Sequence, residues 1–140
     1  MRALGIDLGS KRIGVAISDS DGTVATPITT LTRSRQRADD HSAISGLAAE
    51  WEAEIVVVGV PYSLDGSAGP AAQAVLEEID ELTGALGVPV ATIDERFTTV
   101  TAGQRLREQG VRGARRTAVV DQAAASILLQ SWLDARRSHD

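Results

Sequence analysis

The first third of the chain alternates between apolar and polar or small residues, a pattern typical of strands. Ala3 to Asp7 is a short apolar segment, and the alternation is strictest from Ile13 to Ile17. A Ser20-Asp21-Gly22 turn separates the second segment from Val24 to Leu31, in which Pro27 indicates a strand at the edge of a sheet. Short turns join the three segments, so the pattern predicts an antiparallel meander.

After these strands, the spacing of apolar residues becomes that of an α-helix. Apolar residues recur at intervals of three and four between Asp39 and Glu52, and again from Pro70 to Leu86. A short helix is predicted from Thr98 or Thr99 through Arg107, followed by a flexible link at Gly110 to Gly113. The last helix is expected over Thr117 to Arg136.

Two apolar segments, Ile55 to Val60 and Val88 to Asp94, are predicted to be strands and follow the first and second of these helices. The first is continuously apolar, which is typical of a strand buried on both faces. Three antiparallel strands followed by alternating helices and strands predict the α/β class, with a mixed sheet covered by helices on both faces. The length of 140 residues predicts a single domain over 1–140.

Composition excludes several kinds of chemistry. The chain has no cysteine, which excludes thiol catalysis, cysteine-ligated zinc and iron–sulfur clusters. The formal net charge of −5 argues against binding nucleic acid through bulk positive charge. The longest apolar segment, Ile55 to Val60, is too short to cross a membrane, and Asp7 interrupts any signal-peptide core. We therefore expect a cytoplasmic protein.

Three acidic positions stand out. Asp7 ends an apolar strand, where a turn-capping role is the simpler interpretation. Asp121 extends the apolar stripe of the last helix and is expected to point toward the sheet, either as a metal ligand or as a half-exposed group near the helix N-terminus. Asp94 and Glu95 end the last strand, so one should point inward and the other outward, and Arg96 can pair with either.

Together these acids predict a metal site. Ligand sites in open α/β sheets gather at the carboxyl ends of strands. Carboxylates without a nearby His or Cys suit Mg²⁺ or Mn²⁺. Two such ions roughly 3.5–4 Å apart are the arrangement used for phosphodiester hydrolysis. His41, in the first turn of a surface helix, and His139, beside the C-terminus, are expected to be neither catalytic nor ligands.

Basic residues gather in the segment 105–116, where five arginines and Glu108 give a net charge of +4 in an acidic chain. This segment is either a solvated loop or a clamp for a phosphate backbone. Lys11 and Arg12 follow Asp7 closely enough to contact the same substrate. The predicted nucleic-acid-binding residues are Lys11, Arg12, Arg96, Arg105, Arg112, Arg115 and Arg116.

Four segments resemble the YqgF/RuvX family of bacterial Holliday junction resolvases or pre-16S rRNA nucleases. They are Gly5–Asp19, Val58–Pro70, Asp94–Thr99 and Val120–Asp134, and they follow one another in family order along the whole chain. The resemblance implies a ribonuclease H-like fold with a five-stranded mixed sheet in the order 3-2-1-4-5.

The resemblance also implies Asp7, Glu95 and Asp121 as the catalytic and metal-binding acids, with Mg²⁺ or Mn²⁺ as cofactor. In that strand order Glu95 starts roughly 10 Å from Asp7, because two strand spacings of ~4.8 Å separate them. Asp65, in the loop after the fourth strand, is a nearer alternative ligand. Related resolvases of the RuvC type carry a further acid at the position of Ala124, which this chain lacks.

Two other functions remain open. An actin- or sugar-kinase-type nucleotide-binding domain shares the Asp7-Leu8-Gly9 turn, but such proteins close two domains around the nucleotide. A ribonuclease H-like domain can also bind RNA without cutting it. The sequence leaves open whether the substrate is structured RNA or branched DNA, and whether the protein is a monomer or a homodimer.

Overall fold

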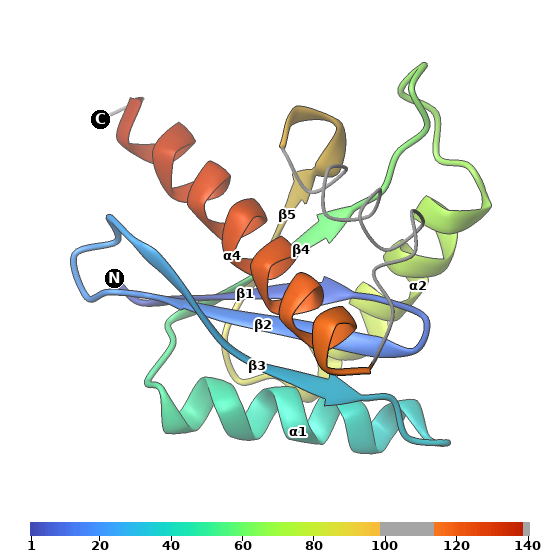
Figure 1. Ribbon diagram of the computed structural model, residues 1–140, viewed down its shortest axis with the longest axis horizontal. Helices are drawn as coiled ribbons and strands as arrows, with labels where there is room; N and C mark the ends of the chain where they lie inside the picture. The colour runs from blue at the N-terminus through green and yellow to red at the C-terminus, as the bar shows by residue number, and fades with distance from the viewer. Residues whose placement is uncertain (99–113, 139–140) are drawn as a thin grey trace.

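A computed structural model describes residues 1–98 and 114–138 (Figure 1). The chain begins with three antiparallel strands and continues with alternating helices and strands, as the sequence pattern predicts. The elements are β1 (Ala3–Leu8), β2 (Arg12–Ser18), β3 (Ala25–Thr32), α1 (Arg37–Glu50), β4 (Ile55–Val60), α2 (Pro70–Ala85), β5 (Val90–Asp94), a 3₁₀ turn (Glu95–Phe97) and α4 (Ala114–Ser138).

The five strands form one mixed sheet in the order β3-β2-β1-β4-β5, which confirms the predicted order. β1 lies at the centre, antiparallel to β2 and parallel to β4. β3 is an edge strand, as Pro27 indicates, and Gly22 has the positive φ of 69° expected in the turn before it.

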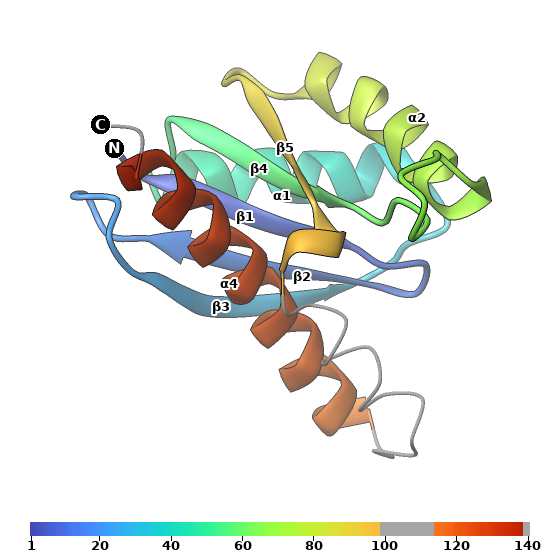
Figure 2. The ribbon, with the colours of Figure 1, turned by 90° about the horizontal axis from the view of Figure 1, so that it is seen from above.

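The helices form a layer on each side of the sheet (Figure 2). α1 and α2 pack on one face, against large aliphatic side chains such as Ile6 of β1 and Val58 of β4. α4 packs on the other face, against smaller residues that include Ala3 and Ala16. Because side chains alternate along a strand, Asp7 falls on the α4 face while its neighbours Ile6 and Leu8 face α1 and α2.

Several element boundaries differ from the sequence prediction. α1 begins two residues earlier than Asp39, and β5 begins at Val90, not at Val88. The predicted short helix from Thr98 or Thr99 to Arg107, like the link at 110–113, falls outside the described residues except for Thr98. A 3₁₀ turn that the pattern did not reveal begins at Glu95, where the side chain of Asp94 accepts a hydrogen bond from the backbone N of Arg96. Within the described residues, no helix has the length and apolar character needed to cross a membrane.

Candidate active site

Three buried carboxylates come from three elements on the α4 side of the sheet. Asp7 near the end of β1 is 6% exposed, Glu95 after β5 is 7% exposed, and Asp121 in α4 is 1% exposed. The inward position of Asp121 confirms the prediction from the helical period. Glu95 is buried and Asp94 is partly exposed, so the expected division between these two acids is also confirmed.

Asp121 lies against the strand beside Asp7. Asp7 pairs with Gly14 of β2, so the two residues face the same side of the sheet. A Cβ atom at position 14 would lie only 2.0 Å from the backbone oxygen of Asp121. The absent side chain at Gly14 therefore lets α4 approach the sheet at the level of Asp7.

Glu95 reaches over β4 from the other side. A Cβ atom at Gly59 of β4 would lie 2.8 Å from Oε1 of Glu95. β1 and β4 pair with Ile6 opposite Val58, and extending this register by one residue sets Asp7 beside Gly59. The carboxylate of Glu95 thus lies over β4, the strand next to that of Asp7.

A basic residue pairs with the helix acid. Nε of Arg12 donates to Oδ2 of Asp121 at 2.9 Å, and the side chains are 29% and 2% exposed. Arg12 comes two residues before Gly14 on β2, so it shares the face that meets α4. A guanidinium at this distance compensates part of the cost of burying the Asp121 carboxylate.

Arg96 follows Glu95 directly, and its side chain is bound by Asp94. Its guanidinium donates three hydrogen bonds to the carboxylate of Asp94, at 2.7–3.2 Å, and lies 4.9 Å from the ring centre of Phe97. The hydrogen bonds from Arg96 hold the pKa of Asp94 below its ordinary value. Asp65 is exposed, and hydrogen bonds from Ser67 lower its pKa.

The donor set is chemically suited to a hard cation, because all three buried acids offer only carboxylate oxygens. Among the residues that the structure describes, however, no group of three or more His, Asp or Glu side chains is arranged to hold a metal ion. A shared metal site at Asp7, Glu95 and Asp121 therefore stays a prediction, as does the participation of Asp65.

The predicted nucleic-acid-binding residues are only partly described. Lys11 is exposed in the turn between β1 and β2, beside the partly buried Arg12. Arg115 and Arg116 lie in the first turn of α4, though only their backbone is described. Arg105 and Arg112 lie outside the described residues.

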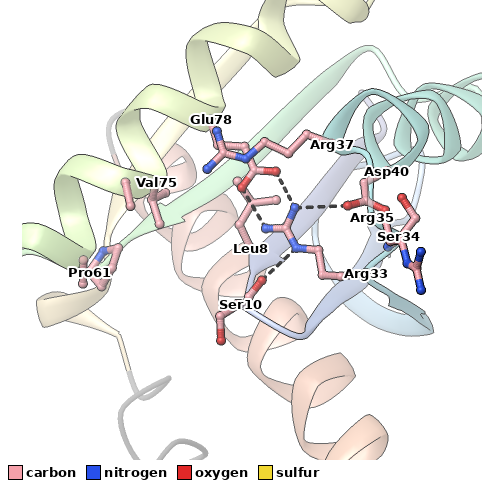
Figure 3. A pocket seen from close by; sticks show the side chains of 13 residues that line it. Leu8, Ser10, Arg33, Ser34, Arg35, Arg37, Asp40, Pro61, Val75 and Glu78 are labelled. Atoms are coloured by element: carbon pink, nitrogen blue, oxygen red, sulfur yellow. Dashed lines mark hydrogen bonds and ion pairs between the residues drawn. The ribbon is translucent and has the colours of Figure 1, made fainter.

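A cavity of about 480 Å³ lies near the end of β1, on the α1 and α2 side (Figure 3). Arg33 lies at its centre and pairs with Glu78 through two hydrogen bonds of 2.5 and 2.7 Å. Arg33 also reaches Asp40 at 3.4 Å and donates to the backbone oxygen of Gly9 at 2.9 Å. These groups bind one another, so the network connects the β1–β2 turn and the loop before α1 to helix α2.

The surface position expected for His41 is wrong. His41 is 3% exposed, and its Nε2 lies 2.9 Å from Oε2 of Glu78. Burial raises the pKa of Glu78, but the hydrogen bonds from Arg33 and His41 outweigh burial and lower the pKa below its ordinary value. The partner of His41 lies 37 residues away in α2, which the helical period of α1 alone does not reveal.

Sequence reasoning also missed the two glycines that border Asp7. Gly14 and Gly59 lie within strand patterns that assign them no role. The signal is present, because a glycine inside a strand often marks the close approach of another backbone or group. The identity of the approaching group, α4 at Gly14 and Glu95 at Gly59, depends on the tertiary fold.

Comparisons with known proteins agree with this arrangement. The family model described as "RuvX: Holliday junction resolvase" matches residues 1–135. A protein of Myxococcus xanthus named "Putative pre-16S rRNA nuclease" is 48% identical over all of this chain and 92% of its own length. A protein of Mycobacterium ulcerans with the same name is 48% identical over 98% of this chain and 81% of its own length.

The fold has a counterpart among solved structures. RuvC of Thermus thermophilus, solved in complex with a Holliday junction substrate, superposes with a TM-score of 0.57 at 18% identity, covering 99% of this chain and 96% of RuvC. This likeness shows that the sheet and its helices are of the ribonuclease H-like type. Since the family model also matches nearly the whole chain, the protein belongs to the RuvX family.

Proposed function

We propose that this nuclease of the ribonuclease H-like fold is a divalent-metal-dependent endonuclease, with Asp7, Glu95 and Asp121 as its catalytic and metal-binding acids. One observation carries the proposal: three carboxylates from separate elements are buried on one face of the sheet, around the end of its central strand. A protein that only bound nucleic acid would gain nothing from negative charge at this place.

Oxygen-only ligands favour Mg²⁺ or Mn²⁺ at these acids. When bound, a pair of such ions supplies an activated water and the positive charge that stabilises the leaving oxygen. Asp7 is the central acid, because it lies between Gly14 on one neighbouring strand and Gly59 on the other. Asp121 approaches from α4 and Glu95 from the 3₁₀ turn after β5, so the acids would meet the scissile phosphate from two sides.

The basic residues around the three acids are the proposed phosphate-binding groups. Lys11 and Arg12 follow the central strand, and Arg96 adjoins Glu95. We assign backbone contacts to these three residues and to Arg105, Arg112, Arg115 and Arg116. An arginine suits this role because its guanidinium can bind two phosphate oxygens at once.

For the substrate we propose structured RNA, namely the precursor of 16S rRNA, after the name of the relatives that match across most of their own length. This substrate places the protein in the cytoplasm. A Holliday junction is the second candidate, after the description of the family model. Both substrates present closely spaced phosphate backbones to the acid site.

The decisive experiment compares wild type with Asp7→Asn on both substrates, a pre-16S rRNA fragment and a four-way DNA junction, with Mg²⁺ or Mn²⁺. Asparagine keeps the shape of the side chain and removes its charge. We expect cleavage to be lost and binding to be unchanged or tighter, because one negative charge near the phosphate is gone. Full cleavage by Asp7→Asn would refute the mechanism.

The same variant tests the simpler turn-capping role of Asp7. That role predicts little loss of activity and a stability cost of about 1 kcal/mol. The acid-site role predicts a stability that holds or rises, because close carboxylates repel one another without metal. Tight RNA binding by a wild type that cuts neither substrate would instead indicate an RNA-binding module, and saturable ATP binding would favour the nucleotide-binding alternative.

A further inference from the structure

After Ile55, β4 consists of valines interrupted by one glycine. Its residues Val56, Val57, Val58 and Val60 are all fully buried, and Gly59 lies between the last two. Glycine weakens a strand, because it adds backbone entropy and offers no side chain to pack. The strand therefore lacks the packing that a valine or alanine would provide at this position. We look for the reason in the surroundings of Gly59.

Those surroundings are dominated by Glu95. A Cβ atom at position 59 would lie 2.8 Å from Oε1 and 3.0 Å from Cγ of Glu95, and 3.1 Å from Cδ2 of Leu128. A Cβ atom essentially never lies within 3.0 Å of a heavy atom from outside its own residue and the two residues beside it in the chain. The carboxylate of Glu95 thus uses the space that any other residue at position 59 would fill.

This space lies on the path from Glu95 to Asp7. β5 and β1 lie on opposite sides of β4, roughly two strand spacings apart. Glu95 can extend toward Asp7 on the α4 face only by passing over β4. Gly59 pairs with Ile93 of β5. Extending the register of β1 and β4 by one residue sets Gly59 beside Asp7.

We propose that Gly59 is a positioning residue of the acid site: its missing side chain gives the Glu95 carboxylate a path across β4 to the side of Asp7. Gly59 contacts neither substrate nor metal in this role and acts only through Glu95. The inference rests on the proposed function, since it concerns the same acids.

The other glycines of this face have a different role. A Cβ atom at Gly5 would meet Cβ of Leu129 at 2.7 Å and the backbone oxygen of Ala125 at 3.0 Å, and one at Gly14 would meet the backbone of Asp121. There the obstacle is the body of α4, which cannot move without undocking the helix. At Gly59 the nearest atom is the end of a flexible side chain, so in Gly59→Ala the carboxylate should move while the fold stays intact.

The test measures Mn²⁺ binding to the folded protein without substrate, by titration with electron paramagnetic resonance detection of free Mn²⁺. Loss of a group that orients a metal ligand commonly weakens metal binding by about 10–100-fold. We expect Gly59→Ala to weaken Mn²⁺ binding by about 10-fold or more with an unfolding midpoint close to that of wild type. In a Glu95→Gln background, the same substitution should cause no further loss of affinity.

Gly46→Ala is the matched control, because it adds the same methyl group in α1, on the opposite side of the sheet, where no heavy atom lies within 4 Å of the new Cβ atom. It should leave Mn²⁺ affinity within about twofold of wild type, well below the effect of removing a ligand-orienting group. A Gly59→Ala variant that bound Mn²⁺ as tightly as wild type would overturn the inference. Failure of that variant to fold would also overturn it, because the inference holds that the Glu95 carboxylate moves aside and the fold stays intact. No Mn²⁺ binding by wild type would instead refute the metal site of the proposed function.

Discussion

Arg12 and Asp121 form an ion pair between residues 109 positions apart, with Nε of Arg12 donating to Oδ2 of Asp121 at 2.9 Å. The pair joins the second strand to the last helix at the proposed acid site. It supplies positive charge at the helix acid, where a divalent ion would supply it in the metal-bound protein.

Arg12→Ala should therefore destabilise the metal-free protein and increase the stabilisation by Mg²⁺. Removing one partner of a buried polar pair costs about 1–3 kcal/mol of unfolding free energy. Added Mg²⁺ should replace part of the missing charge, so the unfolding midpoint should rise more in Arg12→Ala than in wild type. Urea unfolding with and without Mg²⁺ measures both effects.

A suitable control is Arg37→Ala. Arg37 pairs with Glu81, and both side chains are about half exposed. An exposed pair contributes about 0–1 kcal/mol, and it lies in the layer of α1 and α2. An equal response of both variants to Mg²⁺ would show that Arg12 and the ion do not compete at Asp121.

Glu78 should make stability dependent on pH. Its pKa in the folded protein is below the ordinary value of 4.5, so folding favours the ionised form. The resulting stabilisation is complete above the unfolded pKa and is lost as the pH falls through the lower folded pKa. We expect the unfolding free energy of wild type to fall more steeply than that of Glu78→Gln when the pH is lowered from about 6 to about 3.

At neutral pH Glu78→Gln should cost about 1–3 kcal/mol, because it weakens a buried network with Arg33 and His41. Glu81→Gln in the same helix provides the exposed comparison. If wild type and Glu78→Gln lost stability in parallel through the acid range, the network would not be the source of the acid sensitivity.

The basic segment should control the salt dependence of substrate binding. Removing one phosphate contact lowers the slope of log binding constant against log salt by about 0.7–0.9, depending on the number of strands. The combined change of Arg112, Arg115 and Arg116 to alanine should thus flatten the slope by about 2–3. Binding isotherms over a series of salt concentrations measure it.

The far end of α4 offers the comparison. Arg136 lies over the ring of Trp132, and Arg137 pairs with Asp134. Alanine at these two positions should leave the slope unchanged. If alanine at Arg136 and Arg137 changed the slope and alanine in the basic segment did not, the binding surface would lie at the opposite end of α4.

The sequence revealed the layers of the fold because periodicity reports which face each residue occupies. The position of Asp121 on the apolar stripe predicted its burial, and Pro27 predicted the edge strand. The partners of these residues are set by long-range geometry, which a period does not encode. The pairing of Arg12 with Asp121 and of His41 with Glu78 could be found only from the fold.

The two faces of the sheet should respond in opposite ways to changes in residue size. On the side of α4 the central strands carry small residues, among them Ala3, Gly5, Gly14 and Ala16, and the helix backbone lies close to them. Enlarging a packed position typically costs about 1–3 kcal/mol. On the other side, truncation of large aliphatic residues such as Leu4, Ile6 and Ile13 leaves cavities that cost about 2–5 kcal/mol. A designer can thus repack the face of α1 and α2 with residues of equal volume, while the positions that the backbone of α4 approaches, such as Gly5 and Gly14, leave almost no freedom of choice.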